Sequence, residues 1–351
     1  MAMALQLARK GVYSTHPNPR VGCVIVQNEN IVGAGWHSLA GQPHAEIYAL
    51  NEAKDKARGA TAYVTLEPCS HQGRTGPCAD ALINAGIKQV VVAMTDPNPQ
   101  VSGKGLARLK QAGIVVVCGV LAEESRQLNE GFCKRMEQGL PFVRLKMAMS
   151  LDGRTAMSSG ESQWITQAPA RSIVQKLRAQ SSAIVVGADT VLVDRARLTV
   201  RPDELDQRTV LRVLIDGQLR VPIDVPFFQA GPALVATCRD CPREDFAQQG
   251  HRQLTIPGPE NHVDLRKLLH YLAKQEANEV LVETGSKLAG AFLQQKLVDE
   301  LKIFMAPKLL GSYALPLFDL PFSAMREALA LDIKDIRAVG NDWLITAKPK
   351  Y

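Results

Sequence analysis

One histidine and two cysteines near the start of the chain have the residue types and the spacing of a metal site. His44 stands in "PHAE", and Cys69 and Cys78 each directly follow a proline in "EPCSHQGRTGPC". One imidazole and two thiolates hold zinc tetrahedrally and leave one position open, as in catalytic zinc sites. Water at such a position becomes acidic enough to supply hydroxide near neutral pH. The sequence therefore predicts a catalytic zinc held by His44, Cys69 and Cys78.

Glu46 is predicted to act beside the metal without binding it. It lies two residues after His44, at the expected start of a helix, where both side chains can face one pocket. A carboxylate in that place can shuttle protons between water and a substrate. Taken singly, a cysteine in a turn is most often an inert small apolar residue, and a lone histidine a surface residue. The combination of H-A-E with two P-C pairs favours zinc.

The same residues resemble the cytidine-deaminase superfamily, whose signature is H-x-E…P-C-x-x-C. Eight residues separate Cys69 from Cys78 here instead of two, which argues against cytidine deaminases and against tRNA or DNA editing enzymes. With "THPNPRVGCVIV", the segment resembles a narrower family, the pyrimidine deaminase half of a bifunctional deaminase/reductase of riboflavin biosynthesis. The resemblance assigns Asn18 to pyrimidine binding. The inserted His71 and Arg74 suit a substrate phosphate or base edge.

The second half of the chain carries further motifs of the same family, in order. They are "KMAMSLDGRTA", "SGESQWIT", "VGADTVLVDRARLTVR" and "VLVETGSKLAGAFLQQKLVDELKIFMAPKLLG". They resemble the reductase half, which has a dihydrofolate-reductase-like fold and uses NADPH. The resemblance thus covers nearly the whole chain.

A glycine-bearing turn follows the strand that ends at Glu283. Gly285 and Gly290 bracket the entry into a helix, where backbone N–H groups can cradle a pyrophosphate. The spacing is similar to a Walker A loop, but Ala291 and Phe292 replace its Lys and Ser/Thr, so ATP hydrolysis is not expected. An ordinary strand-to-helix turn is the alternative interpretation.

The resemblance assigns individual residues of this half. Cofactor-contacting positions are Ala148, Trp164, Thr190, Asp194, Gly217, Gly285, Ser286, Lys287, Leu288, Ala289, Gly290 and Ala291. Substrate-contacting positions are Ser162, Arg178, Leu198, Arg201 and Glu283. Arginine suits the substrate phosphate because its fork binds two oxygens at once. Lys146 and Glu283 are the catalytic candidates to orient or protonate the substrate, and the sequence leaves open which does so. Gly217 stands where the family has Ser, so its contact would be through backbone.

Length and composition bound these interpretations. At 351 residues the chain exceeds the roughly 250–300 residues that one core supports, so two domains are expected. No apolar run approaches the ~18–20 residues needed to cross a bilayer, and the N-terminus is typical of an amphipathic helix rather than a signal peptide. Seven cysteines at irregular spacing favour a reducing compartment, the cytoplasm. The net charge of +6 suits phosphorylated substrates as readily as nucleic acid.

The pattern of strands and helices predicts an α/β protein with two domains. Residues 1–139 are expected to form a cytidine-deaminase-like α/β/α layered domain, and residues 140–351 a dihydrofolate-reductase-like α/β domain. The first contains a hairpin at 21–36, a helix from 43 with Pro43 at its first position, a buried strand at 114–120 and one helix at 121–136. In the second, residues 217–232 are expected to be loop.

The resemblance implies two successive reactions. In the first, zinc-activated water attacks C2 of 2,5-diamino-6-ribosylamino-4(3H)-pyrimidinone 5′-phosphate and ammonia leaves. In the second, NADPH delivers hydride to C1′ and gives the ribitylamino phosphate. One Zn²⁺ per chain, NADPH and a homo-oligomer, dimer or tetramer, are expected, with no nucleic acid or membrane partner.

Two other classes compete with this interpretation. A nucleic-acid editing protein would need a basic groove with stacking aromatic residues, which the loops around the zinc motif lack. A purely structural zinc would need a fourth protein ligand, and none is evident. The C-x-x-C pair Cys238 and Cys241 is not accompanied by a second such pair, so it is interpreted as two inert thiols.

Overall fold

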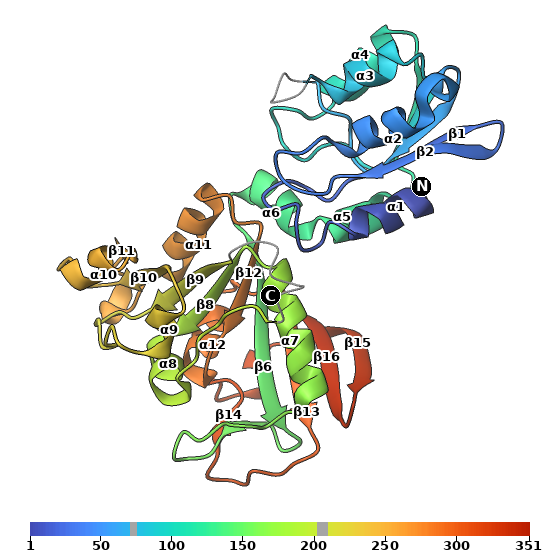
Figure 1. The fold of residues 1–351 in the computed structure, drawn as a ribbon. Coiled ribbons are helices and arrows are strands. Elements are labelled where there is room, and N and C mark those ends of the chain that lie inside the picture. Colours follow the sequence, from blue (N-terminus) through green and yellow to red (C-terminus); the bar gives the residue numbers. More distant parts are fainter. Residues whose placement is uncertain (71–75, 202–209) are drawn as a thin grey trace. The chain divides into compact units, whose positions relative to one another are not determined.

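The computed structural model describes residues 1–70, 76–201 and 210–351. The chain forms two compact units, residues 1–140 and 141–351, each built around its own sheet (Figure 1). Within the described ranges, no helix has the length and apolar character needed to cross a membrane.

Unit 1 is built on a five-stranded sheet with the order β2-β1-β3-β4-β5. The strands are β1 Gly22–Gln27, β2 Asn30–Trp36, β3 Thr61–Val64, β4 Gln89–Val92 and β5 Val115–Cys118. The first two form the expected antiparallel hairpin, and β3, β4 and β5 run parallel. Because parallel neighbours share one carboxyl edge, the segments that follow β3 and β4 emerge side by side.

Helices cover both faces of this sheet. Helix α1 (Ala2–Arg9) approaches β1 so closely that a Cβ on Gly22 would lie 2.0 Å from the carbonyl oxygen of Ala4. Helix α2 (Ala45–Ala53) approaches β2 in the same way, since a Cβ on Gly33 would lie 2.1 Å from the carbonyl oxygen of Ala49. Gly33 pairs with Ile25 of β1, which lies three positions after Gly22. Because successive residues of a strand face opposite sides of the sheet, Gly22 and Gly33 lie on different faces, and so do α1 and α2. The expected α/β/α layering is confirmed.

The remaining helices of unit 1 lie after the strands. They are the 3₁₀ turn η1 Lys54–Ala57, α3 Cys78–Asn84, α4 Lys104–Gln111, α5 Ala122–Leu128 and α6 Glu130–Gln138.

Three local expectations for unit 1 are wrong. The single helix at 121–136 is two helices separated at Asn129, because the side chain of Asn129 exchanges hydrogen bonds with the backbone of Arg20. Pro43 precedes the helix, whose N-cap is His44. Strand β5 is an exposed edge and not buried, with Val115 54% accessible.

Unit 2 is built on a nine-stranded sheet with the order β11-β10-β9-β8-β12-β6-β13-β16-β15. The strands are β6 Phe142–Ser150, β8 Ala183–Gly187, β9 Leu211–Ile215, β10 Ala233–Thr237, β11 Arg252–Thr255, β12 Glu279–Glu283, β13 Glu300–Ala306, β15 Leu331–Val339 and β16 Asp342–Pro349. In this order, each strand from β11 through β13 is parallel to its neighbour. A small second sheet pairs β7 (Arg154–Ala156) with β14 (Leu315–Pro316).

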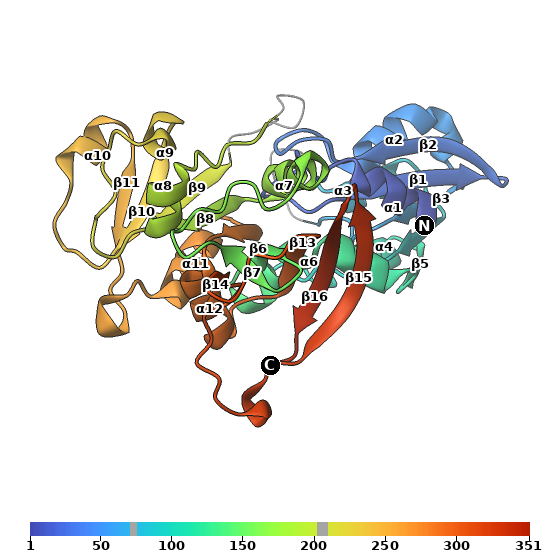
Figure 2. The same cartoon turned by 90° about the horizontal axis from the view of Figure 1, so that it is seen from below.

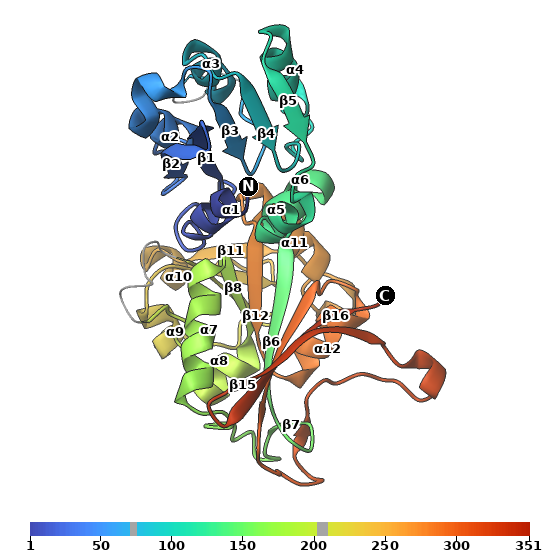
Figure 3. The ribbon, with the colours of Figure 1, turned by 90° about the vertical axis from the view of Figure 1, so that its right-hand side faces the viewer.

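The helices of unit 2 are α7 Ala168–Gln180, α8 Ala188–Asp194, α9 Pro226–Gln229, α10 Glu244–Gln248, α11 Leu265–Lys274 and α12 Ser286–Gln294, with short 3₁₀ turns at Pro259–Asn261 and Met325–Glu327. Figure 3 shows α7 in front of the sheet and α11 and α12 behind it. Helix α7 buries Ala170, Val174 and Leu177 against Leu281 of β12 and Phe304 of β13. The mixed α/β class is confirmed for this unit.

The C-terminal hairpin of β15 and β16 is an addition to the elements predicted from the sequence. Its strands pair antiparallel and extend the sheet beyond β13 (Figure 2). Most residues of β15 are exposed, including Ile333 and Ile336, so the strand lacks the buried alternation by which a strand is recognised. The predicted loop at 217–232 contains the short helix α9.

Candidate active sites

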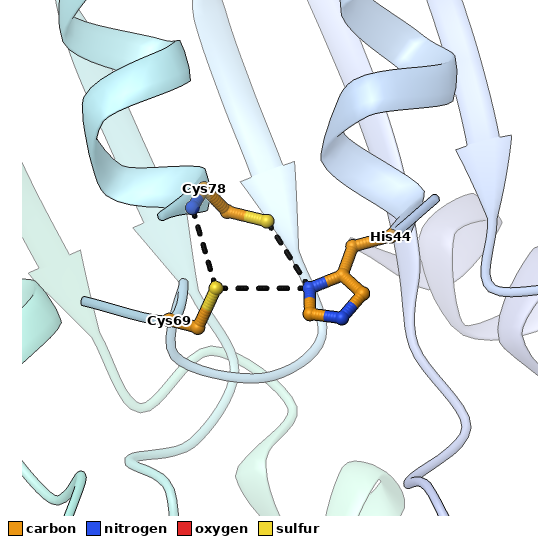
Figure 4. A group of neighbouring side chains, drawn as sticks. All are labelled: His44, Cys69 and Cys78. Atoms are coloured by element: carbon orange, nitrogen blue, oxygen red, sulfur yellow. Dashed lines mark hydrogen bonds between the residues drawn. The ribbon is translucent and has the colours of Figure 1, made fainter. Parts of the chain in front are cut away.

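The three predicted zinc ligands come together in unit 1. His44 caps the start of α2, Cys69 follows β3, and Cys78 is the first residue of α3. His44 Nδ1 lies 3.2 Å from Cys78 Sγ and 3.7 Å from Cys69 Sγ (Figure 4). Among the described residues, His44, Cys69 and Cys78 form a group of neighbouring side chains that could hold a metal ion.

The spacing of the donor atoms fits zinc. Zn–S bonds of about 2.3 Å and Zn–N bonds of about 2.0–2.1 Å at tetrahedral angles place nitrogen and sulfur roughly 3.6 Å apart. The three ligand atoms here all lie within 4.8 Å of one another. Three protein donors leave a fourth position for water or substrate, which is the catalytic pattern.

The two cysteines shift one another's pKa in opposite directions. The side chain of Cys78, together with its backbone N–H 3.3 Å away and the His44 ring, lowers the pKa of Cys69 to about 4. The neighbouring Cys69 thiolate and burial raise the pKa of Cys78. The cluster therefore already carries thiolate character at the N-terminus of α3, as a metal-binding site requires.

Glu46 is buried beside the cluster, with 3% of its surface exposed. Burial raises the pKa of its carboxyl to about 7, against an opposing effect of His44. Its carboxylate is not among the clustered ligand atoms. A carboxyl near neutral pKa can both accept and return a proton.

His37 is a site residue that the sequence did not reveal. Its Nδ1 lies 3.1 Å from the carbonyl oxygen of Pro43, so it carries the proton, and Nε2 accepts from Asn18 Nδ2 at 3.0 Å. Its ring packs edge-on against His44, with 5.4 Å between centroids. Asn18 is thereby tied to the segment that enters α2. A histidine just after a strand was the available signal, and it is too common to interpret alone.

His71 and Arg74, predicted to contact the substrate, lie outside the described residues.

A second polar cluster lies at the carboxyl edge of the sheet in unit 2. Glu283, the last residue of β12, pairs in register with Lys146 of β6. Arg178 of α7 donates from Nε to Glu283 Oε1 at 2.6 Å and from Nη2 to Oε2 at 3.0 Å. Lys146 Nζ lies 3.9 Å from Glu283 Oε2. Three residues that the sequence assigned separately thus form one charged group.

The charges within this cluster shift one another. Burial acts to raise the pKa of Glu283, but Arg178 and Lys146 bring it below its usual range. Burial lowers the pKa of Lys146, and Glu283 offsets part of that effect. The cluster therefore holds an ionised carboxylate next to an ammonium group that releases its proton more readily than usual.

The segment 194–201 is tied to the same cluster. Arg178 Nη1 donates to the carbonyl oxygen of Thr199 at 3.0 Å. Leu198 is buried with a positive φ of 54°, while the side chain of Arg201 is exposed. Of the two predicted substrate-contacting arginines, Arg178 is buried in the cluster and Arg201 has an exposed side chain.

A second pair of predicted residues meets at the C-terminus of α8. Ser162 Oγ donates to Asp194 Oδ1 at 2.7 Å. Trp164 is 63% exposed, with the guanidinium carbon of Arg171 4.6 Å above its ring. Thr190 lies on α8 and faces the turn after β12, since its Oγ1 is 4.0 Å from where a Cβ on Gly285 would stand.

The glycine-bearing turn connects β12 to α12, as predicted. Gly285 is the N-cap of α12, and the helix begins at Ser286. Gly290 has a packing role, because a Cβ there would lie 2.0 Å from the carbonyl oxygen of Asp319.

Two further predicted cofactor positions lie on other strands of the sheet or just after them. The carbonyl oxygen of Gly217, after β9, accepts hydrogen bonds from the backbone N–H of Cys238 and from Thr237 Oγ1. Ala148 lies on β6, two residues beyond Lys146.

Comparison with known proteins gives one consistent result. Residues 141–345 match the family described as the RibD C-terminal domain, and residues 1–94 match the cytidine and deoxycytidylate deaminase zinc-binding region. The chain is 52% identical to the riboflavin biosynthesis protein RibD of Escherichia coli K12, over 97% of this chain and 96% of that protein. It is 47% identical to RibD of Haemophilus influenzae, over 100% and 96% of the two chains.

Solved structures agree with the sequence comparison. The chain superposes on Acinetobacter baumannii RibD, form 1, with a TM-score of 0.93 and 44% identity, covering 100% of this chain and 98% of that one. It also superposes on the diaminohydroxyphosphoribosylaminopyrimidine deaminase/5-amino-6-(5-phosphoribosylamino)uracil reductase of Thermotoga maritima, with a TM-score of 0.89 and 34% identity over 100% and 97% of the chains.

Proposed function

The chain belongs to the RibD family of bifunctional riboflavin-biosynthesis enzymes, and from that premise we propose how its residues divide the work. It is both a zinc-dependent deaminase and an NADPH-dependent reductase. The substrate is 2,5-diamino-6-ribosylamino-4(3H)-pyrimidinone 5′-phosphate, and the product of both steps is 5-amino-6-ribitylaminouracil 5′-phosphate. The observation that carries the first step is the His44, Cys69 and Cys78 cluster with Glu46 buried beside it.

For deamination, His44, Cys69 and Cys78 hold the zinc, and Glu46 moves the protons. Zinc bound there supplies a Lewis acid that makes water acidic near neutral pH. Glu46 takes a proton from the attacking water, passes it to the ring nitrogen and assists the departure of ammonia from C2. Asn18, held by His37, orients the pyrimidine, with His71 and Arg74 as further substrate contacts.

For reduction, the Glu283 cluster holds the ribosyl end of the deaminated intermediate. NADPH supplies hydride to C1′ of that group. Lys146 and Glu283 hold and move the proton that accompanies the transfer, and Arg178 fixes the carboxylate in place. Arg201, whose side chain is exposed, binds the substrate phosphate. Ser162 and Leu198 complete the substrate contacts.

The residues that would hold NADPH lie along the carboxyl edge of the unit 2 sheet. The free backbone N–H groups at the start of α12, those of Ser286, Lys287 and Leu288, would receive the pyrophosphate. The other predicted positions of this turn, Gly285, Ala289, Gly290 and Ala291, would line the cofactor without donating from the helix. Ala148, Trp164, Thr190, Asp194 and Gly217 supply the remaining contacts. Residues 1–139 constitute the deaminase and residues 140–351 the reductase.

The working state of the enzyme is a cytoplasmic homo-oligomer, a dimer or tetramer. Support comes from exposed apolar side chains on the edge strand β15, where Ile336 is 55% accessible. All seven cysteines are free thiols, which suits a reducing compartment. Light scattering of the pure protein and fractionation of the source cells test the two statements.

The decisive experiment follows both steps on purified protein with the diaminopyrimidine ribotide. Ammonia release and NADPH oxidation are recorded together. We expect both signals, with NADPH consumed only after ammonia appears. Ammonia release without NADPH oxidation would contradict the assignment of the second unit, and absence of both from zinc-loaded protein would contradict the substrate.

A further inference from the structure

Glu67 is a buried carboxylate to which the deaminase chemistry above gives no role. It lies in "TLEPC", two residues before the zinc ligand Cys69, and only 4% of its surface is exposed. A buried carboxylate is costly unless hydrogen-bond donors surround it. The structure supplies those donors from a different segment of the chain, the loop 95–103 and the helix α4 that follows it.

Four backbone N–H groups converge on this carboxylate. Its Oε1 accepts from Gly105 at 2.8 Å and Leu106 at 3.3 Å, and its Oε2 accepts from Gly103 at 2.9 Å and Asp96 at 3.1 Å. Three of these donors belong to the N-cap and first turn of α4, where N–H groups have no partner inside the helix. Gly103 has no side chain with which to cap them. Glu67 therefore caps α4 from outside and also meets the favourable end of its dipole.

Helix α4 also contacts the backbone next to Cys69 directly. A Cβ on Gly105 would lie 2.0 Å from the carbonyl oxygen of Pro68, so only glycine allows this approach. Leu109, one turn further, is fully buried in the core of unit 1 and anchors the helix. The segment Glu67–Cys69 therefore packs directly against α4, a helix that is itself anchored in the core of unit 1.

A second contact one turn along α4 reaches both cysteine segments. Arg108 Nη1 donates to the carbonyl oxygen of Ser70 at 3.4 Å. The same guanidinium pairs with Asp80, with Nε 2.5 Å from Oδ1 and Nη2 2.7 Å from Oδ2. Ser70 follows Cys69, and Asp80 is two residues after Cys78 on α3. One helix therefore contacts the neighbours of both thiolate ligands.

From these contacts we infer that Glu67 is a positioning residue of the deaminase site. Its carboxylate holds the Cys69 segment against the first turn of α4, and Arg108 connects the same helix to Asp80, two residues after Cys78. These contacts of α4 with the two cysteine segments are called the brace. The brace fixes the separation of the two sulfur atoms, on which zinc retention and deamination both depend. The inference rests on the proposed assignment of His44, Cys69 and Cys78 as the zinc ligands.

The test compares E67Q with E52Q and R108M. In E67Q one carboxylate oxygen becomes an NH₂ group, which cannot accept from the two N–H groups it faces. Glu52 is the matched control, because its exposed carboxylate accepts a single backbone bond, from Ala34 at 2.8 Å, on β2. R108M removes the second contact at a half-exposed surface position and replaces the aliphatic part of the arginine with an unbranched apolar chain.

The readouts are zinc release to a chelator, the visible spectrum of the cobalt-substituted protein and the two activities. Loss of groups that orient metal ligands typically costs about 10–100-fold in metal affinity or activity. We expect E67Q to release zinc and to lose deamination within that range, with an altered cobalt spectrum. R108M should show a smaller change in the same direction. Reduction of the deaminated intermediate should remain at the wild-type rate in both, and E52Q should match wild type throughout.

Two results would overturn the inference. One is an E67Q protein whose unfolding midpoint falls while zinc release and the cobalt spectrum stay as in wild type, because Glu67 would then serve folding alone. The other result can be obtained even if E67Q does not fold: it is an R108M protein with wild-type zinc release and deamination. Contacts of α4 with the two cysteine segments would then not be needed to hold the zinc ligands in place. Failure of the ligand assignment is distinguishable, because wild-type protein would then bind no zinc or C78A would retain it.

Discussion

Arg178 and Glu283 face one another fork to fork, with two parallel N–H···O bonds of 2.6 and 3.0 Å between α7 and β12. Both side chains are largely buried, and Lys146 approaches the same carboxylate from β6. The third guanidinium nitrogen is bonded to the backbone of Thr199. All three guanidinium nitrogens of Arg178 therefore donate to Glu283 or to the backbone of the segment 194–201.

Removing the Glu283 carboxylate should weaken unit 2 and its reaction together. E283A leaves two cations without their partner, and breaking a buried pair costs about 3–5 kcal/mol of unfolding free energy. Reduction of the deaminated intermediate should fall by about 100-fold or more, because displaced groups of this kind disrupt alignment. Urea unfolding and steady-state kinetics measure the two effects.

The control for this variant is E137A. Glu137 forms an equally bidentate pair with Arg126, but on the surface of unit 1. Exposed pairs contribute about 0–1 kcal/mol, so E137A should leave both activities and nearly all stability intact. Equal destabilisation by the two variants, or loss of deamination in E283A, would contradict the independent roles given to the two sites.

The same pair should make unit 2 sensitive to acid. The pKa of Glu283 is lower in the folded chain than its ordinary value, so the unfolded chain binds more protons between those two pKa values. The stabilisation is complete above the ordinary carboxyl pKa of about 4.3 and is lost as pH falls through the folded-state value. Urea midpoints of wild type and E283Q should therefore converge in acid and differ at neutral pH. A difference that stays constant down to pH 3 would contradict this origin.

Glu46 should be essential for deamination alone. E46Q keeps the size of the side chain but cannot shuttle protons, and such proton transfer contributes about 10²–10⁴-fold. Ammonia release should fall by that factor, whereas bound zinc and the reductase rate should not change. Metal analysis and separate assays of the two steps check the prediction. Loss of zinc from E46Q would show that Glu46 is a ligand.

The zinc cluster was predictable because metal chemistry restricts residue types. Few combinations of His and Cys hold zinc with an open position, so His44, Cys69 and Cys78 could be grouped although 34 positions separate the first from the last. In the structure their ligand atoms lie within 4.8 Å of one another. The fold class followed from the order of strand and helix patterns, and it is also confirmed.

Other features depend on tertiary contacts that no local pattern records. Asn129 breaks a helix because it bonds to Arg20, 109 residues earlier. Arg144 is buried between Glu279 and Glu300, which lie 135 and 156 residues further along the chain. The register of β6 with β12 and β13 creates this contact, and each residue alone resembles a surface charge.

The cysteine pair of unit 2 provides a contrast for the metal site. C78A should lose zinc and deamination, because two remaining donors do not complete a zinc site. C238A and C241A should keep one zinc per chain, since neither thiol belongs to the clustered donors of the described residues. Metal content of the three purified variants decides the matter. Zinc loss from C238A would mean that the C-x-x-C pair binds metal after all.

Gly285 and Gly290 should respond differently to the same substitution. In G290A the new Cβ would meet the backbone of Asp319 at 2.0 Å, and overpacking of this kind costs about 1–3 kcal/mol even after the gain in helix propensity. In G285A the nearest atom to the new Cβ is Thr190 Oγ1 at 4.0 Å and the N-cap backbone is extended, so the expected loss is only that by which Ala is a poorer N-cap than Gly, about 1 kcal/mol or less. If the turn receives the cofactor pyrophosphate, the new methyl group obstructs it and the KM for NADPH rises. Thermal unfolding and NADPH titration separate the two effects. A stable G285A with an unchanged KM would place the pyrophosphate elsewhere on the sheet edge.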